Sequence, residues 1–256
     1  MNKPARIKRS SFLCLWIVAL VVTVVVSACV SGETKGNLGN THSSVATRSP
    51  IATPTSSLLS KPVIYVALGA SDAVGVGSNQ PGSQGYVPLL AAHLPKGSRL
   101  INLGVSGIRL HEALSQELPL AMTTSPNLIT IWLVANDFVS GVSYDSYMHD
   151  LNILLQQLHT NTHARIVMAN LPDLTLLPAF SGLSASRKAL ALQEIQGWNA
   201  GIAAAASRYG VGLVDLFSHK SQLTAHPEYV SADGFHPSPA GYVQLADIFW
   251  EAIQGS

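Results

Sequence analysis

Cysteine, charge and metal-binding clusters are all scarce in this sequence. Its 256 residues include only two cysteines, Cys14 and Cys29, and charged residues make up 11% of the total. No group of His, Cys, Asp and Glu residues has the spacing of metal ligands, and no glycine-rich segment carries the Lys-Ser/Thr pair of a phosphate-binding loop. We therefore expect neither a metal nor a nucleotide cofactor.

The N-terminus has the layout of a secretory signal peptide. Residues 1–11 contain four basic residues and no acidic one, and residues 12–26 are apolar except for Thr23. As a helix, this apolar run would extend about 22 Å, which is shorter than the hydrocarbon core of a bilayer at about 30 Å. We therefore expect a signal peptide and not a permanent membrane span.

The next segment, Val26-Ser27-Ala28-Cys29, resembles a bacterial lipobox. That resemblance implies that residues 1–28 are removed and that Cys29 becomes the lipid-bearing first residue of an extracytoplasmic protein on the cell membrane. An ordinary secretory signal with an incidental Cys29 and an uncleaved N-terminal anchor are the alternatives. Because Cys14 lies in the removed part, no internal disulfide can form, and a hydrophobic core must hold the fold together.

Residues 29–60 are predicted to form a flexible tether, because Ser, Thr, Gly and Pro are frequent there and aromatic residues are absent. Loss of the four basic residues of the signal peptide lowers the formal charge from +1 to −3. This balance gives no reason to expect binding to nucleic acid. Residues 61–256 are enough for one domain with one core, and the tether makes a monomer the simplest expectation.

The folded part alternates short apolar runs with stretches of helical spacing. The runs predict strands buried on both faces, at residues 63–68, 100–103, 128–134, 166–169 and 211–216. Helices are predicted at residues 86–94, 110–118, 144–159, 186–209 and from about residue 238. Parallel strands need helical crossovers, so this order predicts an α/β fold in three layers, with helices on both faces of a mostly parallel sheet of about five strands.

Several polar or glycine-containing segments lie just after these strands. Ser71 follows the first strand, residues 104–107 follow the second, and Asn136-Asp137 follows the third, while residues 233–236 precede the last helix. Ligands of parallel α/β sheets bind outside the carboxyl ends of the strands. We therefore expect the four segments to meet at one edge of the sheet.

Ser71, His236 and Asp233 together offer the groups of a nucleophilic serine. A serine hydroxyl needs a base to take its proton, and an imidazole works best as that base when a carboxylate fixes its tautomer. A carboxylate three residues before the imidazole can reach Nδ1 and leave Nε2 for Ser71. Ser238 can cap the last helix and Pro239 suits its first turn, so we expect a fixed loop before that helix.

Four segments resemble, in order, the blocks of the SGNH (GDSL-type) hydrolases: Gly69-Ala70-Ser71, Asn102-Leu103-Gly104-Val105-Ser106-Gly107, Ala135-Asn136-Asp137 and Asp233-Gly234-Phe235-His236. The resemblance covers nearly all of the folded part and implies a flavodoxin-like fold. It also implies that Ser71 attacks the acyl carbon, that His236 is the general base and that Asp233 orients it. The oxyanion would be stabilised by the backbone amides of Ser71 and Gly107 and by the side-chain amide of Asn136, with Gly104 as the alternative glycine.

The sequence departs from the family pattern at two positions. Ala70 stands where an acid usually precedes the serine, and Ala135 stands where a glycine usually precedes the asparagine. The first change leaves open what holds the serine loop, and Asp72, on the other side of the serine, is a candidate for part of that task. The second adds a methyl group that is expected to narrow the oxyanion side of the pocket.

The sequence therefore predicts a serine hydrolase that cleaves carboxylic esters through an acyl-enzyme at Ser71. Residues 75–86 and 171–183 are the expected borders of its pocket, and their small and apolar residues admit short acyl, lipid or acetylated-glycan esters. A surface lipoprotein that binds a ligand without turnover and an acyltransferase on the same scaffold are the alternatives.

Overall fold

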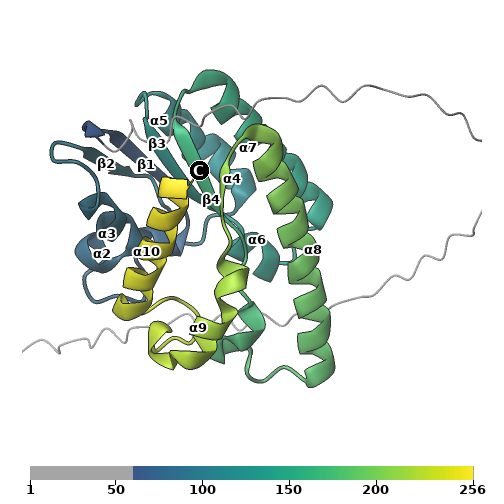
Figure 1. Cartoon of the computed structure of the whole chain (residues 1–256). Helices are drawn as coiled ribbons and strands as arrows, with labels where there is room; N and C mark the ends of the chain where they lie inside the picture. The colour runs from purple at the N-terminus through teal and green to yellow at the C-terminus, as the bar shows by residue number, and fades with distance from the viewer. Residues whose placement is uncertain (1–59, 256) are drawn as a thin grey trace, which may run out of the picture. The chain divides into compact units, whose positions relative to one another are not determined.

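A five-stranded parallel sheet lies at the centre of the structure, a computed structural model that describes residues 60–255 (Figure 1). The strands lie in the order β2-β1-β3-β4-β5, and all neighbouring strands are parallel. Their bounds are β1 Ile64–Gly69, β2 Arg99–Asn102, β3 Leu128–Trp132, β4 Arg165–Ala169 and β5 Gly212–Val214. The predicted α/β fold with about five strands is thus confirmed.

Helices cover both faces of the sheet (Figure 1). They are α1 Ser71–Val74, α2 Pro81–Gln84, α3 Tyr86–Ala92, α4 Leu110–Gln116, α5 Leu118–Met122, α6 Ala135–Val139, α7 Tyr144–Asn161, α8 Ala185–Tyr209, α9 Lys220–Ala225 and α10 Pro239–Gly255. Short 3₁₀ helices are η2 Leu174–Leu176, η3 Pro178–Phe180, η4 Leu216–His219 and η5 Pro227–Tyr229. On one face α10 packs against α3, β4 and β5, and α7 packs against α4, α5 and α8 in the layer on the other face.

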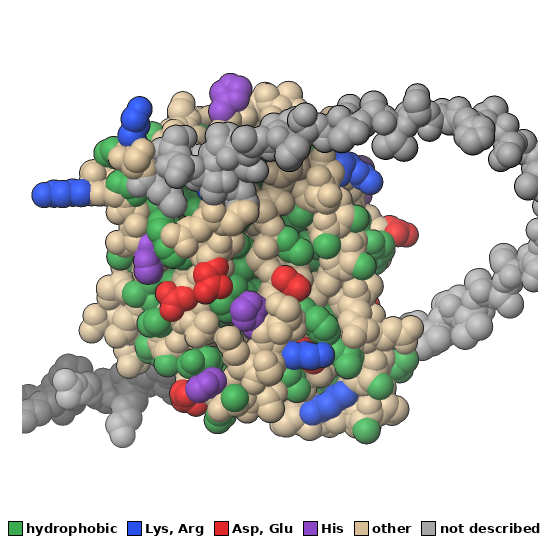
Figure 2. Space-filling view, in the orientation of Figure 1, with side chains coloured by type: hydrophobic (Ala, Val, Ile, Leu, Met, Phe, Trp, Pro, Cys, Tyr) green, Lys and Arg blue, Asp and Glu red, His purple; other side chains and the backbone are tan. Residues whose placement is uncertain are grey.

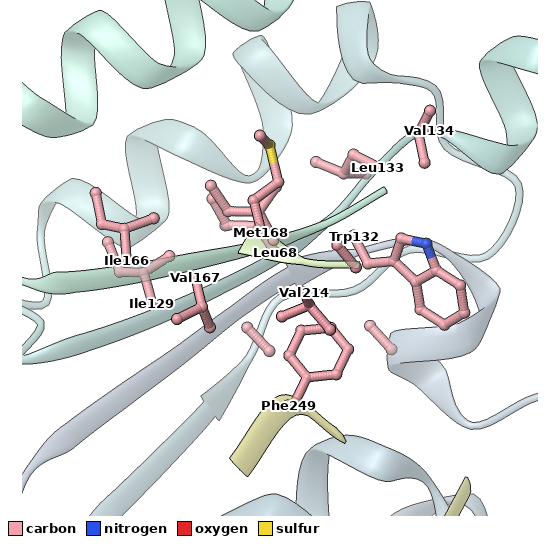
Figure 3. Close-up of a cluster of buried hydrophobic side chains, with 14 of the residues drawn as sticks. Leu68, Ile129, Trp132, Leu133, Val134, Ile166, Val167, Met168, Val214 and Phe249 are labelled. Carbon is pink, nitrogen blue, oxygen red and sulfur yellow. The ribbon is translucent and has the colours of Figure 1, made fainter. Parts of the chain in front are cut away.

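The core occupies both faces of the sheet (Figure 3). On one face, Phe249 of α10 stacks on Tyr86 of α3 with ring centroids 4.8 Å apart, and Trp132 of β3 meets Tyr86 edge-on. Figure 3 shows Val214 beside Phe249 on this face, whereas Met168 of β4 points to the opposite face. Each fully buried side chain of this size stabilises the fold by about 1.5–3 kcal/mol, so the strand ends are held by close packing.

Two details of the strand prediction are wrong. β2 and β5 are the edge strands of the sheet, so they are only partly buried and not buried on both faces. The strand predicted at residues 128–134 ends at Trp132, because the chain turns into α6, which begins at Ala135. Asn136 therefore lies in the first turn of a helix.

The helix predicted at residues 110–118 is shorter than expected and is followed at once by a second helix. Pro119, the second residue of α5, has no N–H to donate, and its ring clashes with the carbonyl of an unbroken helix. Glu117 therefore lies at the junction of α4 and α5, from which its side chain reaches β1.

The surface drawn in Figure 2 mixes hydrophobic, acidic, basic and histidine side chains, and on that face charges of one sign do not gather into a large area. Within residues 60–255, every helix is too short or too polar to cross a membrane. The predicted signal peptide, Cys29 and nearly all of the predicted tether lie outside the described residues.

Candidate active site

Ser71 lies where β1 ends and α1 begins. The turn between them is tight, because a Cβ atom placed on Gly69 would lie only 2.7 Å from the Cβ of Ala73. Ser71 itself is 5% exposed, and its hydroxyl faces the loop that precedes α10. The turn therefore presents the hydroxyl at the carboxyl edge of the sheet.

His236 and Asp233, in the loop before α10, complete a chain of hydrogen bonds with Ser71. The distance from Ser71 Oγ to His236 Nε2 is 2.9 Å, and His236 Nδ1 lies 2.7 Å from Asp233 Oδ2. With its proton on Nδ1, a neutral imidazole donates to Asp233 and accepts from the Ser71 hydroxyl. The contacts expected from the spacing of Asp233 and His236 are therefore present.

Asp233 is fixed by donors on its second oxygen. Oδ1 accepts hydrogen bonds from the backbone N–H groups of Phe235 at 2.8 Å and His236 at 2.9 Å, and from the Ser231 hydroxyl at 2.8 Å. Partial burial alone would raise the pKa of Asp233, but these donors and the His236 side chain together lower that pKa to about 2. The carboxylate is therefore charged at every pH at which the histidine can act as a base.

The expected capping residue holds this loop against α10. Ser238 Oγ accepts a hydrogen bond from the backbone N–H of Gly241 at 3.2 Å and donates one to the backbone oxygen of Glu228 at 2.5 Å. Pro239 is the first residue of α10, where its missing N–H costs no helical hydrogen bond. The loop that carries Asp233 and His236 is thereby tied at its carboxyl end.

Two glycines were candidates for the second oxyanion donor, and their amides differ. The N–H of Gly104 donates to Asn102 Oδ1 at 3.0 Å, so it is already engaged. Among the described residues, nothing accepts a hydrogen bond from the N–H of Gly107, which has φ = +82° and open space on its side-chain side. This difference favours Gly107 as a donor to a bound oxygen atom.

Asn136 lies beside the same turn. Its Nδ2 donates one hydrogen bond to the backbone oxygen of Ile108 at 2.8 Å, which fixes the amide, and a primary amide has a second N–H to offer. The neighbouring Asp137 also holds the turn, because its Oδ2 accepts from the backbone N–H of Leu110 at 3.0 Å. Asn136 and Gly107 are thereby brought to the same side of the site.

Asp72 does not hold the serine loop as the sequence suggested. Its carboxyl makes no hydrogen bond to another residue of the described chain, and it lines a cavity instead. Burial raises the pKa of Asp72 to about 6, although the nearby His236 acts to lower it. Asp72 is therefore a buried acid beside the site and not a link between its segments.

Glu117, which the sequence analysis did not single out, makes the link expected of an acid near the serine. Its Oε2 accepts a hydrogen bond from the backbone N–H of Gly69 at 3.0 Å. Burial raises the pKa of Glu117 to about 8. The only signal in the sequence was an acid two residues before Pro119 in a mostly apolar stretch, 48 positions from Gly69.

A cavity of about 110 Å³ lies next to the site, between α10, α9 and η2. Asp72, Ala135 and Phe235, each adjacent in sequence to a predicted site residue, line part of it. Residues 172–174 and Leu177 come from one of the two expected border segments, but residues 75–86 of the other segment do not line this cavity. Most of the remaining wall is apolar.

Two of the residues that line the cavity each have a buried polar atom without a hydrogen-bond partner among the described residues: Trp132 Nε1, a donor, and Gln222 Oε1, an acceptor. Buried polar atoms are nearly always paired in folded proteins. Within residues 60–255, no three His, Cys, Asp or Glu side chains are grouped in a way that could hold a metal ion.

The sequence pattern of the GDSL-like lipase/acylhydrolase family matches residues 67–244, which include every predicted catalytic residue. The chain belongs to this family. A comparison with curated proteins finds no match. The predicted family and the predicted ester hydrolase are therefore confirmed by the family match.

Solved structures similar to this GDSL-like acylhydrolase share its fold. TesA is 23% identical with a TM-score of 0.58, and the match covers 75% of this chain and 98% of TesA. LAE5, an α/β hydrolase from the metagenome of Lake Arreo, is 19% identical with a TM-score of 0.63, and the match covers 77% of this chain and 98% of LAE5. Axe2, an acetylxylan esterase from Geobacillus stearothermophilus, is 18% identical with a TM-score of 0.61, and the match covers 77% of this chain and 96% of Axe2.

Proposed function

We propose that this GDSL-like acylhydrolase cleaves carboxylic esters through an acyl-enzyme at Ser71. The hydrogen-bond chain from Ser71 Oγ through His236 to Asp233 carries this proposal, with its distances of 2.9 Å and 2.7 Å. The first distance lets His236 take the proton of the Ser71 hydroxyl, and the second lets Asp233 orient the imidazole.

In the first half of the reaction, Ser71 Oγ forms a bond to the acyl carbon as its proton passes to His236 Nε2. The resulting imidazolium is stabilised by the Asp233 carboxylate. When the tetrahedral intermediate collapses, the bond to the alcohol oxygen breaks, and the alcohol takes the proton from Nε2. In the second half, a water molecule gives its proton to Nε2 and attacks the acyl-enzyme, which releases the acid and restores the Ser71 hydroxyl.

The negative oxygen of the intermediate accepts hydrogen bonds from the backbone amides of Ser71 and Gly107 and from Nδ2 of Asn136. Two observations support this assignment: the Gly107 amide has no acceptor among the described residues, and Asn136 is fixed through Ile108 with one N–H left over. Donors fixed in advance need no reorganisation during the reaction, and each contributes about 2.7–4 kcal/mol to transition-state stabilisation.

The substrates are esters with a short acyl group, among them acetylated glycans. The cavity beside the site supports this choice, because its volume of about 110 Å³ is smaller than that of an engineered apolar cavity of about 150 Å³ that binds benzene. Its wall is mostly apolar, which suits an acyl chain and not a charged group. The acetylxylan esterase Axe2 has the same fold, which is a second reason to test acetyl esters first.

A Ser71→Ala variant tests the mechanism. We expect at least a 10³-fold loss of kcat on short-chain nitrophenyl esters with an unchanged circular dichroism spectrum, because the nucleophile is lost without altering the core. A fluorophosphonate should label Ser71 in the wild type and nothing in the variant. Full activity in Ser71→Ala would exclude the mechanism, and ligand binding without labelling would favour the non-catalytic alternative. Ester formation with a competing alcohol would identify an acyltransferase.

We also infer that Cys29 carries a lipid that attaches the enzyme to the membrane from the extracytoplasmic side, with residues 30–60 as a tether and a monomeric domain beyond it. The lipobox-like segment before Cys29 supports this proposal. In the bacterial host, Cys29→Ser should abolish labelling by a fatty-acid analogue and move the protein out of the membrane fraction. Unchanged labelling would contradict lipidation at this residue and leave the esterase mechanism unaffected.

A further inference from the structure

Glu117 places a carboxyl group against the backbone at the end of β1, just before Ser71. Its side chain is 1% exposed, and it is the one glutamate among the buried residues of the described chain. Oε2 accepts a hydrogen bond from the N–H of Gly69 at 3.0 Å, whereas Oε1 has no hydrogen-bond partner among the described residues. This side chain thus holds the end of β1 through Gly69.

The segments after β1 and β2 carry two of the proposed oxyanion donors. Gly69 is two residues before Ser71, and Val105 is two residues before Gly107. The segments also touch directly, because the N–H of Val105 donates to the backbone oxygen of Gly69 at 3.0 Å. The position of the Ser71 amide relative to the Gly107 amide therefore depends on the contacts that Glu117 makes.

The acid that usually precedes the serine in this family is Ala70 here, and the carboxyl of Asp72 makes no hydrogen bond to another residue of the described chain. Glu117 supplies a carboxyl at the base of the serine loop from a different element. We propose that Glu117 is a positioning residue, which holds the Ser71 and Gly107 amides at the separation that an oxyanion needs. This inference rests on the proposed esterase mechanism.

The charge state of Glu117 suits this task. Burial raises the pKa of Glu117 to about 8, while the hydrogen bond from Gly69 and the nearby backbone of Val105 act in the opposite direction. No ion pair within residues 60–255 includes Glu117, and no charged side chain contributes to its pKa. At neutral pH the group is thus uncharged and can accept the backbone hydrogen bond from Gly69 without placing a negative charge beneath a developing oxyanion.

Two substitutions at this position separate the hydrogen-bonding role from the charge. Glu117→Leu removes the acceptor, and we expect kcat on a short-chain nitrophenyl ester to fall about 10–100-fold with KM changed less than about 2-fold, because small shifts of the donors act on the transition state. Glu117→Gln keeps an oxygen acceptor without an ionisable group and should retain kcat within about 3-fold of the wild type. Glu194→Gln, an exposed change on α8, is the matched control.

The dependence of kcat on pH distinguishes this role from a purely structural one, which would leave that dependence unchanged. Wild-type kcat should fall above about pH 8, as Glu117 loses its proton, and Glu117→Gln should lack this fall. The proposal would be overturned if Glu117→Leu kept the kcat of the wild type, or if the Leu and Gln variants lost kcat equally. It would also be overturned if kcat of the wild type and of the Gln variant fell in the same way at alkaline pH. Should Glu117→Leu not fold, the Gln profile alone decides. Absence of Ser71-dependent turnover in the wild type would instead refute the esterase mechanism.

Discussion

Single residues around the site differ in charge because their environments differ. Asp233 is partly buried, which favours the protonated form, but its hydrogen bonds lower its pKa to about 2. Burial raises the pKa of Asp72 and Asp137 to about 6 and that of Glu117 to about 8, because the backbone hydrogen bonds near these carboxyls lower the pKa less than burial raises it. Around pH 7 the fold therefore keeps a full negative charge next to His236 and a neutral carboxyl beneath the proposed oxyanion donors.

The raised pKa of Glu117 predicts how stability changes with pH. The unfolded chain loses this proton near pH 4.5 and the folded chain near pH 8, so the folded state binds more protons between these values and is destabilised as pH rises. The slope is at most about 1.4 kcal/mol per pH unit. Between pH 6 and 8, above the pKa of Asp72 and Asp137, wild-type stability should therefore fall relative to Glu117→Gln.

Urea unfolding of both proteins at pH 6, 7 and 8 measures this difference. Histidines titrate in the same range, but they are common to both proteins and cancel in the comparison. A constant difference in unfolding free energy across these three pH values would show that Glu117 keeps its ordinary pKa in the fold.

At the scale of elements, the turn after α1 touches the loop before α10 through Gly77. The residue has φ = +97°, and a Cβ atom there would collide with the backbone oxygen of Pro237 and lie 3.0 Å from Cβ of His236. Close by, the Tyr242 hydroxyl donates to the backbone oxygen of Val76 at 2.5 Å. The element that begins with Ser71 and the loop that carries His236 are therefore in direct backbone contact.

Gly77→Ala should consequently move His236 away from Ser71. We expect kcat to fall about 10–100-fold, and the free energy of unfolding to fall by more than about 1 kcal/mol, because the methyl group meets backbone and the φ angle disfavours alanine. Gly82→Ala is the control, since its added methyl has nothing within 4 Å and its φ is not in the left-handed region. Steady-state kinetics and thermal unfolding of both variants measure the effect, and equal behaviour of the two would contradict it.

At the scale of the whole molecule, the parallel topology gathers the site. β1 and β3 are neighbours within the sheet, and β2 lies beside β1. The segment after β1 meets the loop before α10, the segment after β2 contacts the end of β1, and the segment after β3 contacts the segment after β2. The packing of α3 and α10 against the sheet buries the aromatic cluster around Phe249 that holds this arrangement (Figure 3). The site thus depends on core packing in residues 60–255, which contain no cysteine.

Much of this arrangement was predictable from the sequence, because it follows from local patterns. Runs of apolar residues and helical spacing indicated the alternation of strands and helices, and the spacing of Asp233 and His236 indicated their contact. The parallel sheet then followed from the need for crossovers. The errors, at the edge strands and at the break before Pro119, concern burial and helix packing, which local patterns describe poorly.

By itself, the sequence determined the fold class, the proposed nucleophile Ser71 and the pair Asp233 and His236, since each of these depends on residue type and short-range spacing. Only the tertiary structure decided which glycine has a free amide and which acid supports the serine loop. Gly107 and Glu117 owe their roles to contacts between segments far apart in the chain. Such contacts depend on how the elements pack. The family block in the sequence contained both Gly104 and Gly107, and an acid near Pro119 was the only sign of Glu117.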